Sequence, residues 1–202
     1  MDRSALRSVG SGVGAAVVAY ALTGLVALSL LPRLITQATP TGEESGLFQA
    51  YEAAGQPLWR AAGWILFNEN FIPISVSSEG ETTYGILVPT LAGAEWLFVI
   101  PALACLLGGL VAVRLTTTSS TIPVAVGAYL TVGYTLITLV AALLFTMTAA
   151  GYTVQPNLLS GSTLIWPLVI VGYPLIFGSL GAVIATSPLV REVASSRPES
   201  ER

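Results

Sequence analysis

The sequence contains no histidine, no lysine, one cysteine (Cys105) and few charged residues. Without histidine, an imidazole general base and a histidine-bound haem, zinc or copper site are excluded. A single cysteine excludes an internal disulfide and a thiolate cluster. Charged residues make up 9% of the 202 residues, whereas a soluble domain has about 25%. The chain therefore cannot cover itself with a water-facing surface, which excludes a soluble enzyme.

Hydrophobic residues are abundant instead, at 53%, and they gather in four long runs. A helix needs about 20 apolar residues to cross a hydrocarbon core that is about 30 Å thick. Runs at about 9–31, 96–113, 122–149 and 164–186 meet this requirement and contain no charged residue. We therefore predict an all-α membrane protein, a four-transmembrane-helix bundle that forms one membrane domain over 1–202. The first run is too long for a signal peptide, so we expect it to be retained.

The arginines predict the orientation in the membrane, because they are the only cationic side chains. Two of the eight, Arg33 and Arg60, fall between the first and second runs, and the other six fall on the opposite side. The positive-inside rule then places both termini in the cytoplasm and residues 32–95 outside. All four tryptophans lie in that outer loop or at the outer ends of helices, which agrees with their preference for the interface. The expected location is the cell membrane.

The outer loop, 32–95, is long enough to fold as a subdomain. Apolar residues at helical spacing predict short amphipathic helices, with Pro57 in the first turn of the second. Strand-forming residues over 72–88 flank a Ser-Glu-Gly-Glu turn and predict a β-hairpin. Seven glutamates in the loop predict a solvated acidic surface. Residues 187–202, which mix arginine and glutamate, are expected to form a disordered cytoplasmic tail.

Small residues predict where the helices pack, because they let two backbones approach inside lipid. Small residues four positions apart along a helix are the candidates for these contacts. They include Gly10, Gly14, Gly109, Gly178, Gly181 and Ala182. Residues 20–30 and 134–144 share a tyrosine and a similar Leu/Val/Ala pattern. This similarity indicates either a duplicated helix pair or a chance match between two apolar helices.

Two functions are compatible with these features. The first is a non-enzymatic accessory or interaction subunit of a membrane complex. Its outer loop forms either a lid over the outer ends of the helices or a recognition surface, in which Trp59, Trp64 and Phe67 would contact a membrane protein partner or a second copy. The alternative is a small permease, or its membrane subunit, for a neutral or apolar solute, with a path lined by Tyr20, Thr131, Tyr134 and Thr135.

Other chemistry is not expected. None of the four runs carries the charged residue that marks a proton relay. The sequence has no phosphate-binding loop and no basic patch, so we expect no nucleotide and no nucleic acid to bind. We also predict no catalytic residue, no metal and no cofactor.

The acidic exterior, the absence of lysine and the abundance of Thr, Ala and Val form one compositional pattern. With the four-span topology, it resembles the small uncharacterised multi-pass membrane proteins of extremely halophilic archaea. The resemblance covers the whole chain and is one of composition and topology, so it implies a membrane location without implying an activity.

Overall fold

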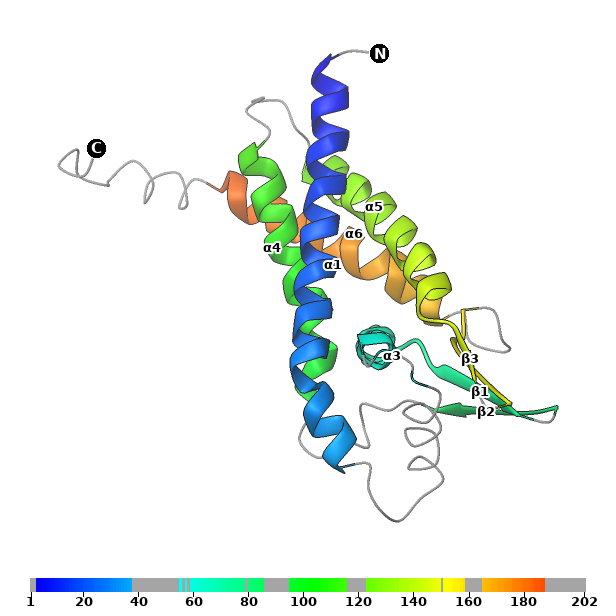
Figure 1. Cartoon of the computed structure of the whole chain (residues 1–202). Helices are drawn as coiled ribbons and strands as arrows, with labels where there is room; N and C mark the ends of the chain where they lie inside the picture. The colour runs from blue at the N-terminus through cyan, green and yellow to red at the C-terminus, as the bar shows by residue number, and fades with distance from the viewer. Residues whose placement is uncertain are drawn as a thin grey trace. The chain divides into compact units, whose positions relative to one another are not determined.

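The computed structural model is mostly helical and contains one small β-sheet (Figure 1). It describes residues 3–37, 55, 57, 59–78, 80–85, 95–115, 123–149, 151–158 and 165–187. The elements in chain order are α1 (Arg3–Gln37), α3 (Trp59–Glu69), β1 (Ile74–Ser78), β2 (Glu81–Gly85), η2 (Glu95–Val99), α4 (Ile100–Leu115), α5 (Pro123–Leu144), β3 (Met147–Ala149), β4 (Tyr152–Pro156) and α6 (Ile165–Thr186).

Four helical segments are long and apolar enough to cross a membrane, and each matches one of the predicted runs. They are Ser8–Leu30, Trp96–Leu115, Ala125–Leu144 and Pro167–Thr186. The predicted end of the third run at 149 is wrong, because α5 ends at Leu144. The next residues form β3, whose backbone pairs with β4 instead of continuing the helix.

The chain divides into two compact units, and all four long helices contribute to both. Unit 1 contains the N-terminal part of α1, most of α4 and α6, and the first half of α5. Unit 2 contains α3, the sheet, η2 and the remaining parts of the long helices. Their bounds are Met1–Ala19, Ala102–Thr135 and Ile170–Arg202 for unit 1, and Tyr20–Pro101 and Leu136–Val169 for unit 2.

The sheet of unit 2 joins two antiparallel hairpins in the strand order β2-β1-β4-β3. Gly80 (φ +88°) lies in the first turn and Gly151 (φ +83°) in the second, where the backbone conformation favours glycine. The first hairpin confirms the one predicted over 72–88. The second was not predicted, because its first strand continues the apolar run 122–149 that resembles a membrane span.

The two faces of the sheet differ in chemistry. One row of directly paired residues crosses all four strands and carries only hydroxyl side chains. On the opposite face Val154 and Met147 are paired and buried. The hydroxyls of the row bond in two exposed pairs, at 3.0 Å between strands β1 and β2 and at 3.1 Å between β3 and β4. We call this row the hydroxyl row; it consists of Thr82, Ser77, Thr153 and Thr148.

Helix α3 is the second of the short helices predicted for the segment between the first two spans. Pro57 precedes it instead of lying in its first turn, and accepts a 3.1 Å hydrogen bond from the Arg60 amide. Every residue from Ala61 to Glu69 is buried, so α3 lies in the interior of unit 2 and lacks the exposed polar face of the amphipathic helix that was predicted. In Figure 1 it is viewed nearly along its axis and lies beside the lower part of α1, where Leu66 approaches Gly24. The rest of the predicted helical stripe and residues 188–202 of the predicted tail lie outside the described residues.

Candidate functional site

The helices of unit 1 meet at glycines, and the closest approach is between α4 and α6. A methyl group at Gly109 would overlap the carbonyl of Gly178, and one at Gly181 would overlap the carbonyl of Leu106. Ala182 is fully buried. Three of the six small residues selected from the sequence therefore lie where two helix backbones touch: Gly109, Gly178 and Gly181.

The other two, Gly10 and Gly14, lie on an open face of α1, with no atom of another element near a methyl group placed there. Neither residue packs against another helix among the described residues of this chain. Gly12 makes the contact instead, because a methyl group there would meet Tyr129 of α5. Two residues along a helix turn by about 200°, so Gly12 faces away from Gly10 and Gly14.

Two glycines of α5 also make close contacts that the sequence pattern missed. A methyl group at Gly127 would overlap the Ser179 hydroxyl of α6, and one at Gly133 would press on Ala16 and Val13 of α1. The two glycines are six residues apart, so they lie on different faces of α5 and fit no four-residue motif. Only the packed structure identifies them.

The hydroxyl side chains proposed to line a path are engaged in packing. In unit 1 Tyr134 is fully buried, Thr135 is half-buried, and the half-buried Thr131 hydroxyl donates a 2.8 Å hydrogen bond to the Gly127 carbonyl. In unit 2 Tyr20 is buried, and its hydroxyl is hydrogen-bonded to the Thr138 side chain. Of these four groups, Tyr20 bonds to another helix, Thr131 bonds within its own helix, and Tyr134 is closed off from the surface.

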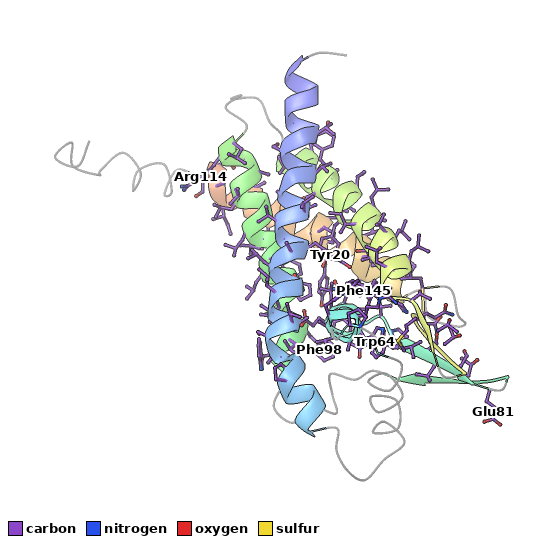
Figure 2. All side chains as sticks on the ribbon, in the orientation of Figure 1. Tyr20, Trp64, Glu81, Phe98, Arg114 and Phe145 are labelled. Carbon is purple, nitrogen blue, oxygen red and sulfur yellow. The ribbon has the colours of Figure 1, made fainter. Side chains whose placement is uncertain are left out.

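The three aromatic residues proposed to contact a partner are divided between the surface and the interior of unit 2. Trp59 is 45% exposed, whereas Trp64 and Phe67 are 0% and 1% exposed. The Trp64 indole donates a 3.1 Å hydrogen bond to the carbonyl of Phe145, and the two residues lie together in Figure 2. Trp64 and Phe67 therefore do not form the exposed surface that was predicted.

Phe145, directly after α5, is the centre of this aromatic cluster. Its ring meets Trp59 and Phe67 edge-on, at centroid distances of 5.6 and 6.1 Å. Gly63 of α3 makes room for it, because a methyl group at that position would overlap the Phe145 ring. Burial of large aromatic surface is a strong stabilising contribution, so this cluster fixes α3 in unit 2.

The chain turns from α3 into β1 through a buried polar segment, residues 68–72, which we call the α3–β1 turn. The Asn68 amide donates to the Ile72 carbonyl and the Asn70 amide to the Leu66 carbonyl, both at 2.8 Å. Phe71 has a positive φ of 55° and stacks on Phe98 of η2 at 4.4 Å. A bulky residue with positive φ is unusual and indicates local strain.

Glu69 ends α3 inside this turn, and its side chain is 0% exposed. Neither carboxyl oxygen accepts a hydrogen bond from the described residues. Burial raises the pKa of Glu69 to about 9, because the charged form loses its hydration without gaining a partner. The prediction of a solvated acidic surface is therefore wrong for Glu69, whereas Glu81 is exposed near the tip of the first hairpin (Figure 2).

Comparison with known proteins places this architecture in a family. Residues 1–188 match the sequence profile of DUF7978, a family of unknown function. The chain belongs to this family. The match includes all four spans, α3 and both hairpins, so the glycine contacts and the α3–β1 turn lie within the DUF7978 region. No curated protein and no solved structure matches the chain.

Two features of this DUF7978 protein offer chemistry beyond helix packing. The hydroxyl row presents neutral donors and acceptors on an exposed sheet face, which suits recognition of another polar surface. Glu69 presents a buried carboxyl that can gain or lose a proton. The first is a candidate interaction site, and the second is a candidate proton-binding site.

Proposed function

We propose that this DUF7978 protein is a non-enzymatic, multi-pass protein of the cell membrane that acts as an accessory or interaction subunit of a membrane complex. The observation that carries the proposal is the contact between helix backbones in unit 1. At Gly109 and Gly181 there is no room for even one methyl group between α4 and α6. Helices packed to this degree make a rigid scaffold that is suited to presenting a surface.

The same packing argues against the alternative, a small permease for a neutral or apolar solute. A solute path needs polar groups that can turn toward water. The Thr131 hydroxyl is instead bonded to its own helix, and Tyr134 is fully buried. The described residues thus favour the interaction subunit over the permease.

The hydroxyl row is the surface that we assign to the partner. The arginine distribution puts both termini in the cytoplasm, and therefore α3 and the first hairpin outside. Thr148 and Thr82 are exposed at the two ends of the row, and Trp59 adds an exposed aromatic ring in the same unit. A neutral, hydrogen-bonding face of this kind suits the outer part of another membrane protein.

Photo-crosslinking in native membranes tests this assignment. We expect a photoreactive amino acid at Thr148 to capture one membrane protein in a discrete product. The matched position is Leu143 of α5, which is 79% exposed on a membrane-spanning helix. There we expect capture of lipid. Crosslinks from residue 148 only to other copies of this chain would contradict a heteromeric complex.

Accessibility to a water-soluble thiol reagent separates the two functions. After Cys105→Ser, single cysteines at residues 20, 131, 134 and 135 should stay unreactive in intact vesicles, whereas Glu81→Cys should react when the outer face is exposed. Labelling at 131, 134 and 135 would mean that water reaches the helix contacts, and it would favour the permease.

A further inference from the structure

The α3–β1 turn combines two unfavourable features within three residues. Phe71 holds a positive φ of 55°, which strains any residue with a large side chain. Glu69 buries a carboxyl whose two oxygens accept no hydrogen bond from the described residues. Its position at the C-terminal end of α3 adds the partial negative charge of the last helix carbonyls. Strain and an unsatisfied acid at one turn indicate a segment with a second accessible conformation.

No described residue around Glu69 donates a hydrogen bond to its carboxyl oxygens. Helix α3 is packed against η2, β1 and β4, against α1 where Leu66 approaches Gly24, and against Phe145. β1 carries no titratable residue, and neither do residues 136–149. The side chains of the residues at 33, 95 and 152 lie outside the described part of the chain. Apart from Glu69, the charged or titratable residues on the parts of these elements that belong to unit 2 are Arg60 of α3, Glu95 of η2, Tyr152 of β4, and Tyr20 and Arg33 of α1.

Each neighbouring amide is held by a hydrogen bond within the turn or to the preceding helix, and neither donates to Glu69. Asn68 and Asn70 flank Glu69 in sequence, and each donates its side-chain amide to a backbone carbonyl at 2.8 Å. A negative charge on Glu69 would therefore need water, and water can reach it only if the turn opens.

We propose that Glu69 is a proton-binding site that controls the α3–β1 turn. With the proton on its carboxyl oxygen, Glu69 is neutral and the turn stays closed. When the O–H bond breaks and the proton passes to water, the carboxylate draws water in and the turn opens. Opening also lets Phe71 leave its positive φ and its stacking on Phe98.

Opening of the α3–β1 turn also affects the β-sheet. The turn leads directly into β1, which pairs with both β2 and β4 at the centre of the four-stranded sheet. Because β1 and β4 also pack on α3, loosening of the turn changes how the sheet is held. The pKa of about 9 for Glu69 puts the event in the alkaline range. This inference stands on unit 2 alone and holds whether or not a partner binds the hydroxyl row.

Infrared spectroscopy and hydrogen exchange on the full chain in lipid vesicles test the proposal. At pH 7 the unsubstituted protein should show a protonated-carboxyl C=O band that disappears with a midpoint near pH 9. Glu69→Gln, which keeps the shape of the neutral acid, should lack this band. Glu81→Gln, at the exposed hairpin residue, should keep it. Should Glu69→Gln fail to fold, Glu69→Met provides the same comparison.

Hydrogen exchange then reports on the turn. Above pH 9, the backbone amides of residues 68–72 should exchange several-fold faster in the unsubstituted protein than in Glu69→Gln at the same pH. The control variant Glu81→Gln should exchange as fast as the unsubstituted protein. An infrared spectrum with no carboxyl band assignable to Glu69 at pH 7 would overturn the proton site. Equal exchange in Glu69→Gln and the unsubstituted protein above pH 9 would overturn its control of the turn.

Discussion

Gly109 of α4 faces Gly178 of α6 so closely that a methyl group on the first would overlap the carbonyl of the second. Inside a membrane the hydrophobic effect does not hold helices together, because lipid chains are as apolar as leucine. Close backbone approach gains dispersion contacts instead. Close backbone contacts such as the one between these two glycines therefore stabilise unit 1.

Substitution of Gly109 tests this directly. We expect Gly109→Ala to destabilise the protein by about 1–3 kcal/mol, because helices α4 and α6 must separate to admit the methyl group. Gly14→Ala is the matched control, since that position is open. There the better helix propensity of alanine should stabilise α1 by up to about 1 kcal/mol. Unfolding in mixed micelles measures both, and equal effects would contradict the packing described.

The aromatic cluster in unit 2 offers a second test. Trp64→Phe removes the indole N–H that bonds to the Phe145 carbonyl and leaves a smaller ring in a closed interior. The expected loss is about 1–3 kcal/mol of unfolding free energy. Trp59→Phe, at a ring that is 45% exposed, should change the midpoint of thermal unfolding much less. A larger effect at residue 59 would show that the interior does not close around Phe145.

The titration of Glu69 makes stability depend on pH. The pKa of Glu69 rises from 4.5 to about 9 on folding. The contribution of the protonated Glu69 to the free energy of unfolding is therefore fully present below about pH 4.5. It is lost progressively as the pH rises toward 9, because the unfolded chain releases the proton more readily. Glu69→Gln lacks this titration.

Unfolding midpoints across pH 5–9 measure the difference between the two proteins. Near pH 5 the two should be similar. With increasing pH the unsubstituted protein should become the less stable, by on the order of 1 kcal/mol per pH unit at most. Parallel curves for the two proteins would show that Glu69 does not titrate in this range.

The topology predicted from the arginines is tested by two single cysteines on a Cys105→Ser background. Glu81 and Arg114 are both exposed (Figure 2), and the positive-inside rule puts them on opposite sides of the membrane. In intact cells a membrane-impermeant reagent should label Glu81→Cys, whereas Arg114→Cys should react only after lysis. The reversed labelling pattern would show that the protein has the opposite orientation in the membrane.

The sequence was sufficient for the four spans, because hydrophobic length is a local property that a single segment carries by itself. It was insufficient for β3. Residues 147–149 read like the end of an apolar helix, and only their pairing with β4, fixed by the second hairpin and by β1, makes them a strand. Strand pairing of this kind depends on partners that a local pattern does not contain.

The spacing of the glycines predicted that helices pack through small residues, but it did not predict which face of α1 makes the contact. Gly10 and Gly14 have the expected four-residue spacing, yet Gly12 lies against α5, because the face that packs is decided by the neighbouring helices. Glu69 was misjudged because counting charges treats every glutamate as solvated. The apolar residues that precede it in α3 were the available signal that the helix end is buried.

We propose that this DUF7978 protein works by binding another membrane protein. The decisive experiment is affinity purification from native membranes in mild detergent, with every co-purifying chain identified and quantified. We predict one membrane protein at a fixed stoichiometry, retained by Thr148→Ser and lost with Thr148→Arg on the hydroxyl row. Recovery of this chain alone, as a homo-oligomer unaffected by either substitution, would show that the hydroxyl row binds no other membrane protein.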